Sequence, residues 1–343
     1  MRPLIAITMG DPAGIGPEIT VRALARPEVH QAALPLVIGD AGCLEAAISL
    51  LGSPLRVRAI GSPAQAREEP GLIQLIDLGL MPSSSHRWGQ VSKVAGEAAF
   101  QYVLTGIGYA MRREIGGVAT GPISKEALHL AGHPYAGHTE IFAEFTGTRD
   151  FAMMLASGRL RVIHVTTHVS MRQAADLIKK ERVLRTILLA RQALEEIGIR
   201  DGRIAVAGFN CHASENGLFG NEEKEQIIPA IQAARKRGVR AEGPFPPDSV
   251  FIKALAGQYD IVVAMYHDQG HIPLKLSGFR IDPVTGRFTS MSGINTTIGL
   301  PIVRTSVDHG TAFDIAGRGI ANEESMVEAI LLAARMALAR NPT

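Results

Sequence analysis

Residues 259–275 read YDIVVAMYHDQGHIPLK, an apolar run that passes directly into two histidines, an aspartate and a lysine. A short run of Ile and Val bounded by polar residues is typical of a strand buried on both faces of a parallel sheet. Similar runs occupy residues 4–9, 34–39, 115–120, 160–167 and 203–209. Helical periodicity spans residues 170–198 and 323–340. Strands that alternate with helices predict an α/β fold with mostly parallel sheets.

The composition narrows the class of protein. The 343 residues include 35 Lys and Arg against 33 Asp and Glu, and 46% of them are hydrophobic. Such a balance argues against nucleic acid as a partner, and no apolar run is long enough to cross a membrane. Cys43 and Cys211 cannot form a disulfide framework, which favours a reducing compartment and a cytoplasmic location.

The length favours two domains, and the sequence contains no low-complexity linker between them. We therefore expect the chain to cross between domains more than once. The predicted limits are 1–137 with 268–343 for one α/β domain. Residues 138–267 would form the second α/β domain.

Three of the predicted strands are followed by a histidine: His168, His212 and His267. Ligands of open α/β sheets bind at the carboxyl ends of strands, and three neutral imidazoles suit a divalent metal ion. A single histidine in this position more often caps or hydrogen-bonds, so the pattern alone leaves both roles open. His164 lies within its run and is expected in the core, whereas His271 is either a neighbour of the metal ligands or a solvated side chain.

A second set of residues is suited to an anion. In AGHTEIFAEFTG, residues 136–147, His138 and Thr139 stand just before a predicted short helix, whose free N–H groups favour negative charge. Thr139 is equally well read as a plain helix cap. Lys275 and Arg304 can hold a phosphate or carboxylate, although each alone can be a surface charge. GDPAGIGPE, residues 10–18, predicts a tight strand-to-helix turn with Pro17 in the first helical turn.

Longer motifs make the chain resemble a known family. They are ITMGDPAGIGPEI, GPISKEAL, GHTE, HVS, GLFGNEE, GPFPPDSVF, YHDQG and GLPIVRTSVDHGTAFDIAG. Together they resemble the 4-hydroxythreonine-4-phosphate dehydrogenase family of vitamin B6 (pyridoxine) biosynthesis and its paralogues, from about residue 4 to the C-terminus. The resemblance implies a fold similar to isocitrate and isopropylmalate dehydrogenases, with two α/β domains and a cleft between them. It also implies a homodimer with the active site at the subunit interface.

The same resemblance implies roles for individual residues. It makes His168, His212 and His267 the ligands of a divalent metal such as zinc, magnesium or cobalt, contributed by both subunits. The residues that it implies for the anionic substrate are His138, Thr139, Lys275, Asn295 and Arg304.

HGTAFDIAGRGIAN, residues 309–322, resembles the adenosine-binding loop of isopropylmalate dehydrogenase and contains Gly310 and Asp314. An aspartate in the position of Asp314 there accepts hydrogen bonds from the ribose hydroxyls. Because an anionic Asp314 would repel a ribose phosphate, we predict NAD rather than NADP as cofactor.

The reaction implied is the metal-dependent oxidation of a secondary alcohol by hydride transfer to NAD, followed by decarboxylation. The general base is not identified, and Asp248 and Asp268 are candidates either for it or for orienting a metal ligand. Residues 280–292 look like an insertion, and Cys211 and Ser214 stand where proline and glycine are expected. These departures flank the substrate residues, so the reaction class is better supported than the substrate.

Several functions remain open on sequence. 4-Phosphohydroxy-L-threonine ranks first as substrate. D-threonate 4-phosphate, D-erythronate 4-phosphate and the cis-dihydrodiol of terephthalate are the alternatives within the family. A metallohydrolase with three histidine ligands would explain the metal and anion residues but not the DHGTAFDIAG motif, and a non-catalytic sensor would bind ligand without turnover.

Overall fold

The computed structural model describes residues 2–82, 85–284 and 288–340. They form two compact units, of which the first joins the residues up to Arg149 with those from Leu300 onward, and the second spans Asp150–Gly299. We predicted the limits after 137 and 267 instead. Helix α6 (His138–Phe145) belongs to the first unit because it packs on α4 (Lys93–Met111). Helix α11 (His267–Gly278) belongs to the second because it packs on strands β6 (Ala152–Ser157) and β7 (Leu160–His164).

The first unit is built on a parallel sheet with the strand order β3-β4-β2-β1-β5-β14. These strands are β1 (Leu4–Thr8), β2 (Leu34–Gly39), β3 (Arg56–Ala59), β4 (Leu72–Asp77), β5 (Gly117–Thr120) and β14 (Arg304–Val307). The predicted strands 4–9, 34–39 and 115–120 are confirmed as β1, β2 and β5. Their apolar side chains are covered on both faces, since Ile5 and Ala6, which point to opposite faces of β1, are both 0% exposed.

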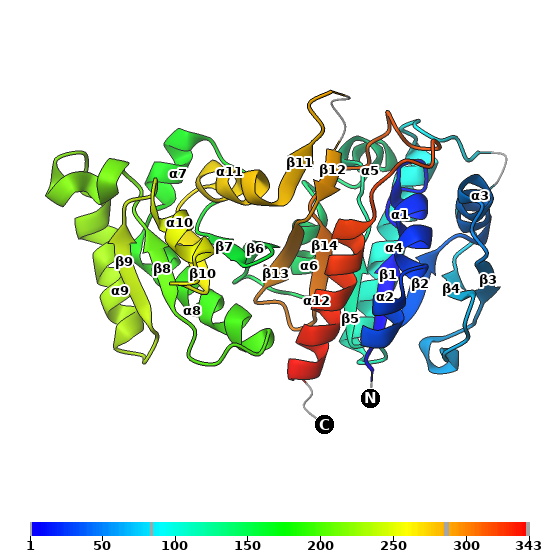
Figure 1. Cartoon of the computed structure of the whole chain (residues 1–343), viewed down its shortest axis with the longest axis horizontal. Coiled ribbons are helices and arrows are strands. Elements are labelled where there is room, and N and C mark those ends of the chain that lie inside the picture. The colour runs from blue at the N-terminus through cyan, green and yellow to red at the C-terminus, as the bar shows by residue number, and fades with distance from the viewer. Residues whose placement is uncertain (1, 83–84, 285–287, 341–343) are drawn as a thin grey trace. The chain divides into compact units, whose positions relative to one another are not determined.

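Helices cover both faces of this sheet. Helix α12 (Glu324–Arg340) lies in front of the strands and α4 behind them (Figure 1), and each packs on β1 and β5. The predicted helix 323–340 is thereby confirmed. The other helices of the unit are α1 (Gly16–Leu24), α2 (Pro27–Ala32), α3 (Ala41–Leu51) and α5 (Lys125–Ala131).

The second unit holds a mixed sheet with the order β13-β6-β7-β10-β8-β9. The remaining strands are β8 (Ile204–Ala207), β9 (Ala241–Phe245), β10 (Ile261–Ala264) and β13 (Ile294–Ile298). Strands β7, β10, β8 and β9 are parallel, whereas β6 is antiparallel to both β7 and β13. The predicted α/β class is confirmed for both units. Strands β7, β8 and β10 correspond to the predicted runs, but they end earlier, at His164, Ala207 and Ala264.

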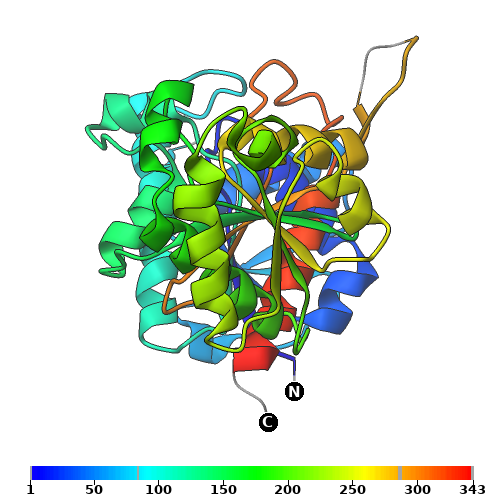
Figure 2. The same cartoon turned by 90° about the vertical axis from the view of Figure 1, so that its left-hand side faces the viewer.

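Helices also cover both faces of the second sheet. Helices α8 (Lys180–Glu196) and α9 (Ile228–Arg235) lie on one side, and α10 (Val250–Leu255) and α11 on the other (Figure 2). Strands β11 (Phe279–Ile281) and β12 (Phe288–Met291) form an antiparallel pair. Apart from Phe279, this pair lies in the segment 280–292 that the sequence marks as an insertion, of which residues 285–287 lie outside the described residues.

The single helix predicted for residues 170–198 is wrong. The structure has α7 (Met171–Leu177) and α8, with Ser170 capping the first through its contact with the Gln173 N–H. Between them Ile178 is buried and Lys179 is extended. The new helix start is satisfied from outside, because the Gln226 side chain accepts a hydrogen bond from the Lys180 N–H at 2.9 Å.

The turn after β1 has the predicted form. Helix α1 begins at Gly16 with Pro17 in its first turn. Gly10 has φ +79°, and a Cβ there would lie 2.4 Å from the Pro122 carbonyl oxygen, so only glycine fits. Asp11 in this turn is 0% exposed; its Oδ1 accepts a hydrogen bond from the Ala13 N–H at 2.9 Å. Burial raises the pKa of Asp11 from 3.8 to about 6, against the lowering effect of the Ala13 and Gly14 N–H groups.

We expect Asp11→Asn to stabilise the protein at neutral pH. The pKa of Asp11 is 3.8 in the unfolded chain and about 6 in the folded protein. The carboxyl therefore lowers the free energy of unfolding progressively as the pH rises from 3.8 to about 6, and the full cost persists at higher pH. At about 1.4 kcal/mol per unit this amounts to about 3 kcal/mol. The stability gain of Asp11→Asn over wild type should therefore be larger at about pH 8 than at about pH 4 in denaturant titrations. An equal difference at both pH values, or the same pH dependence in the exposed control Asp176→Asn, would contradict this account.

Candidate functional site

The three candidate metal ligands follow three neighbouring strands. Strand β10 lies between β7 and β8, and all three are parallel. His168 follows β7, His267 follows β10, and His212 follows β8. Neighbouring strands are about 4.8 Å apart, so the chain leaves the same edge of the sheet at three adjacent points.

His168 and His267 come close together, with ring centroids 5.8 Å apart. His267 is the first residue of α11. The His271 ring stacks on the His267 ring at 3.6 Å and 12°, and its Nδ1 donates to the His267 carbonyl oxygen at 2.9 Å. His271 is buried, so the solvated alternative is wrong. His164 is 0% exposed, as predicted for a core residue, and its ring lies 4.8 Å from that of His271.

The rings behind His267 are neutral at physiological pH. Burial, together with the neighbouring His271, lowers the pKa of His164 to about 3. Burial also lowers the pKa of His271 to about 4, against the raising effect of its hydrogen bond to His267. Uncharged rings do not repel a cation bound at His267. The stacked ring of His271 can therefore orient the His267 ring without opposing a metal ion there.

Carboxylates lie beside two of the candidate ligands. Asp268 Oδ1 is 2.6 Å from His267 Nδ1, and Asp248 Oδ2 is 4.0 Å from His212 Nδ1. A carboxylate on Nδ1 fixes the tautomer and leaves the Nε2 lone pair available to a metal. This placement favours an orienting role for Asp268 over that of a general base.

His212 lies in an unusual backbone segment. Residues 212–216 all have positive φ, between 47° and 66°, although none is glycine. Left-handed backbone costs such residues roughly 1–2 kcal/mol each. Just before this segment, Glu223, only 1% exposed, accepts the N–H groups of Phe209 and Asn210, each at 2.7 Å. The sequence did not single out Glu223, although it lies in the quoted motif GLFGNEE.

One chain does not complete the predicted ligand set. Among residues 2–82, 85–284 and 288–340, no three or more His, Cys, Asp or Glu side chains are placed to bind one metal ion. His168 and His267 are brought together, while the contact recorded for His212 is with Asp248.

The first unit carries a separate, positively charged feature at Arg304. Arg304 lies on β14, is 2% exposed, donates from Nη2 to Thr120 Oγ1 at 3.2 Å, and lies 5.6 Å from the Phe142 ring centroid. Burial lowers the pKa of Arg304 to about 9, opposed by the carboxylate of Glu140. The guanidinium is therefore still charged at neutral pH and is held in a site from which water is excluded.

The positive charge of Arg304 acts on His138. It is the first residue of α6, and its Nε2 is buried with no hydrogen-bond partner among the described residues. Burial and the Arg304 charge lower the pKa of His138 well below its usual value. Thr139 is inside the helix, whose cap residue is Gly137, so the reading of Thr139 as the cap is wrong. A buried guanidinium beside an unpartnered imidazole nitrogen and a helix N-terminus suits a phosphate or carboxylate group.

The other two predicted substrate residues belong to the second unit. Lys275 is exposed on α11, with its ammonium 5.4 Å from the Phe279 ring centroid. Asn295 lies on β13 opposite Leu155 of β6, and its buried Oδ1 has no partner among the described residues. Both polar groups remain available to a ligand.

The predicted cofactor loop lies in the first unit. Gly310 and Asp314 are both exposed. Nothing lies within 4 Å of the position that a Cβ of Gly310 would occupy. The Asp314 carboxylate has no hydrogen-bond or ion-pair partner within the described part of the chain. An open backbone beside a free carboxylate fits the ribose of a dinucleotide.

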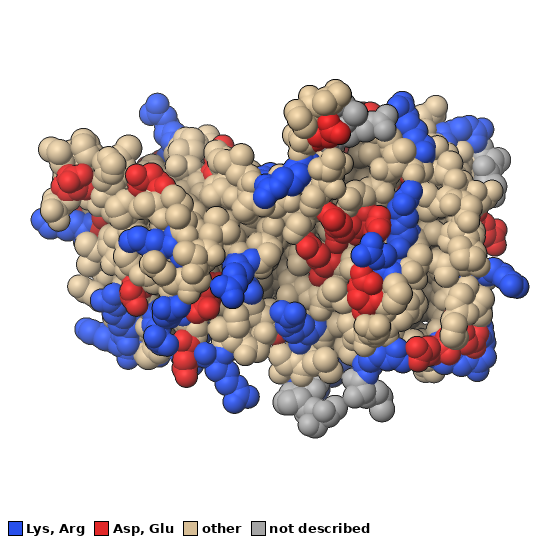
Figure 3. Space-filling model, viewed as in Figure 1, with Lys and Arg blue, Asp and Glu red and all other residues tan. Residues whose placement is uncertain are grey.

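Three further features concern the surface charges, the polarity of the helices and the two cysteines. On the face shown in Figure 3, Lys and Arg side chains lie interspersed with Asp and Glu. Within the described ranges, every helix is too short or too polar to cross a membrane. Cys43 is buried and Cys211 is exposed, and both are free thiols.

Comparisons with known proteins agree with these features. Residues 31–333 match the family model described as pyridoxal phosphate biosynthetic protein PdxA. A D-threonate 4-phosphate dehydrogenase of Cupriavidus necator is 50% identical over 98% of both chains. A crystal structure of a 4-hydroxythreonine-4-phosphate dehydrogenase from Klebsiella pneumoniae is similar with a TM-score of 0.86 and 47% identity over 98% of both chains. A terephthalate 1,2-cis-dihydrodiol dehydrogenase of Burkholderia xenovorans is 30% identical over 98% of both chains, with a TM-score of 0.67.

Proposed function

Because the chain belongs to the family of the pyridoxal phosphate biosynthetic protein PdxA, we propose that it is a metal-dependent, NAD-linked dehydrogenase of a phosphorylated hydroxy acid. Its relatives at about 50% identity are named dehydrogenases, which supports the reaction class. The observation that carries the substrate class is the buried Arg304 beside the open Nε2 of His138. A guanidinium and an imidazole N–H are hydrogen-bond donors suited to phosphate oxygens.

D-threonate 4-phosphate is the substrate that we propose first. The sequence analysis ranked 4-phosphohydroxy-L-threonine first. The relatives at 46–50% identity over nearly their whole length are, however, named D-threonate 4-phosphate dehydrogenases or putative ones. 4-Phosphohydroxy-L-threonine is the second candidate because similar solved structures carry that enzyme's name.

Different residues of the chain would bind the substrate and the metal ion. Arg304, His138 and Thr139, with Lys275 and Asn295, would bind the phosphate end and fix the position of the alcohol relative to the cofactor. His168, His212 and His267 would hold the metal. Three imidazole donors, one of them with the Asp268 carboxylate 2.6 Å from its Nδ1, fit zinc or cobalt by donor chemistry better than magnesium, which prefers oxygen ligands. When bound, such an ion lowers the pKa of the alcohol and stabilises the alkoxide.

Decarboxylation would follow from the substrate. Oxidation of an alcohol β to a carboxylate gives a β-keto acid, and loss of carbon dioxide leaves an enolate that a fixed positive charge stabilises. The two steps also require a base that takes the alcohol proton and an acid that protonates the enolate carbon. The free thiols of Cys43 and Cys211 suit a reducing compartment, and we place the reaction in the cytoplasm.

The substrate can be identified by comparing kcat/KM. Metal-reconstituted protein with saturating NAD would be assayed with D-threonate 4-phosphate, 4-phosphohydroxy-L-threonine and terephthalate dihydrodiol. We expect D-threonate 4-phosphate to give the highest kcat/KM. A higher value for either competitor would reject this substrate and assign the chain to the other branch.

The preference for NAD is expected to depend on Asp314. Asp314→Arg removes the carboxylate that would bind the ribose hydroxyls and adds a cation suited to the 2′-phosphate. The ratio of kcat/KM with NADP to that with NAD should rise by at least about tenfold. Steady-state kinetics with both cofactors measure the ratio, and Asp176→Arg, at an exposed site in the second unit, is the control. An unchanged ratio would exclude Asp314 from the ribose site.

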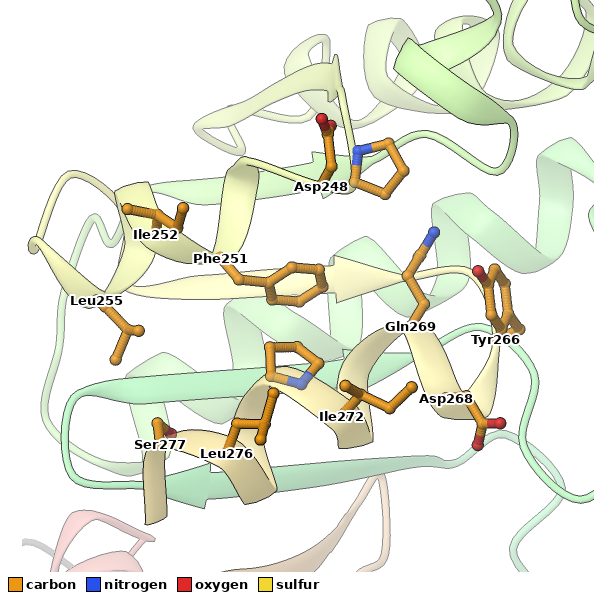
Figure 4. A pocket seen from close by; sticks show the side chains of 12 residues that line it. Asp248, Phe251, Ile252, Leu255, Tyr266, Asp268, Gln269, Ile272, Leu276 and Ser277 are labelled. Carbon is orange, nitrogen blue, oxygen red and sulfur yellow. The ribbon is translucent and has the colours of Figure 1, made fainter. Parts of the chain in front are cut away.

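We also propose a homodimer, as the family resemblance implies, because the described residues of one chain do not place the three histidines around one ion. The candidate surface is a groove of about 560 Å³ between α10 and α11 (Figure 4). Its apolar side chains are unusually exposed, with Ile252 at 68%, Ile272 at 57% and Leu276 at 73%. Groups of exposed apolar side chains are typical of protein interfaces, and a second copy of the chain can cover this one.

Ile272→Asp combined with Leu276→Asp should give a folded monomer with weakened metal binding. Charged side chains in a buried apolar interface oppose association. Light scattering reports the mass, and calorimetry the affinity for zinc. Leu130→Asp, at an exposed position of α5 in the first unit, is the control. A double variant that remains dimeric would place the interface elsewhere.

A further inference from the structure

The motif GDPAGIGPE, residues 10–18, ends in a carboxylate that the proposed reaction does not use. Glu18 is 0% exposed on α1. Its Oε1 accepts a hydrogen bond from the Gly317 N–H at 2.6 Å, and the Gly319 N–H also interacts with the carboxylate. Both glycines belong to the segment 309–322, which contains Gly310 and Asp314. Burial of an acidic side chain is costly unless such contacts compensate for it.

Other contacts join the same two segments. One turn beyond Glu18, Arg22 donates from Nη2 to the Gly319 carbonyl oxygen at 2.5 Å. The Ile15 N–H donates to the Thr311 carbonyl oxygen at 3.0 Å. Helix α1 therefore contacts the segment at its beginning, through Thr311, and at its end, through Gly317 and Gly319.

The segment has no regular secondary structure of its own. Gly317 and Gly319 have φ values of +78° and +65°. A Cβ on Gly317 would lie 2.6 Å from the Trp88 ring. A segment without a helix or strand ladder depends on outside groups to satisfy its backbone, and Glu18 and Arg22 do so for Gly317 and Gly319.

We propose that Glu18, together with Arg22, positions the candidate cofactor loop, residues 309–322. The affinity for NAD would then depend on Glu18, although Glu18 is buried and Asp314 is exposed. Glu18 fixes the two glycines that follow Asp314, and thereby sets where the Asp314 carboxylate stands. Arg22 holds the same segment by donating a hydrogen bond to the carbonyl oxygen of Gly319. The inference rests on the proposed role of residues 309–322 in binding NAD.

Glu18→Ala and Glu18→Gln test the proposal together. Alanine removes both acceptor oxygens, whereas glutamine keeps one oxygen that can accept the Gly317 N–H. We expect Glu18→Ala to raise the Kd for NAD by about tenfold, the scale of one hydrogen bond to a charged group, and Glu18→Gln to restore part of the loss. KM for the phosphorylated substrate and kcat at saturating NAD should stay at wild-type values.

Hydrogen exchange gives a readout that does not need the cofactor. In Glu18→Ala, amides of residues 310–320 should exchange faster, while those of β1 and β5 should not. Glu28→Ala, in α2, where the carboxylate pairs with Arg26 at the surface, is the matched control and should change neither NAD binding nor exchange. If Glu18→Ala does not fold, Arg22→Met provides the same test through Gly319.

The outcomes separate the proposal from the function on which it rests. Unchanged exchange and unchanged Kd for NAD would overturn the positioning role, and so would equal losses in NAD and substrate affinity. If the wild-type protein does not bind NAD, the proposed function fails. Faster exchange confined to residues 310–320 in that case would leave Glu18 as the support of the loop but overturn its role in NAD binding.

Discussion

Replacing His267 with alanine is expected to lower metal-dependent turnover by about a thousandfold while the protein remains folded. A bound divalent ion contributes several kcal/mol to stabilising the alkoxide, and about 1.4 kcal/mol corresponds to a factor of ten. The fold should persist because His267 is partly exposed, at 38% of its side chain, and packs no apolar core. The substitution removes the proposed ligand, whose ring lies 5.8 Å from that of His168.

Kinetics with added zinc, calorimetric zinc affinity and circular dichroism together check this prediction. His129→Ala is a suitable control, because His129 is exposed on α5 and its Nδ1 contacts only the carbonyl oxygen of Lys125. Zinc affinity and turnover at wild-type levels in His267→Ala would remove this residue from the metal site.

Arg304→Met is expected to lower kcat/KM for the phosphorylated substrate by about a hundredfold or more, mainly through KM. Losing one partner of a buried charge pair costs about 2–5 kcal/mol. KM for NAD should not change. Arg304→Lys should lie between wild type and Arg304→Met, because lysine keeps the charge but not the planar fork that binds two phosphate oxygens.

The same Arg304→Met variant should be at least as heat-stable as wild type. Burial lowers the pKa of Arg304 to about 9, which means that its charge disfavours the folded state wherever the side chain is protonated in both states, including neutral pH. Methionine fills a similar volume without that cost. Thermal unfolding and substrate kinetics on one preparation check both effects, and joint loss of stability and activity would instead indicate a structural role for Arg304. Arg237→Met, on an exposed site, is the control.

The parts of the fold that could be predicted are those set by local sequence. The Ile- and Val-rich runs became β1, β2, β5, β7, β8 and β10, because such side chains are buried wherever a parallel sheet is covered on both faces. Pro17 and Ser170 marked helix starts through their own backbone and side-chain chemistry. The break between α7 and α8 could not be predicted, since Gln226, which satisfies the Lys180 N–H, is 46 residues away.

The candidate site was predictable in its residue types but not in its geometry. Three histidines after three strands were visible in the sequence, whereas no residue pattern indicated the left-handed backbone at 212–216, where none of the residues is glycine. Likewise, the burial of Arg304 depends on packing by Phe142 of α6, which no local pattern around β14 indicates. The contacts of Glu18 could not be predicted because its partners, Gly317 and Gly319, are about 300 residues away.

The most direct test of the central claim is NADH formation from D-threonate 4-phosphate and NAD by protein stripped of metal and then reconstituted with zinc, magnesium or cobalt. We predict NADH formation that a chelator abolishes and added metal restores, without release of inorganic phosphate. Phosphate release without NADH would support the metallohydrolase instead. NADH formation that is equal with and without chelator would contradict the role of the three histidines.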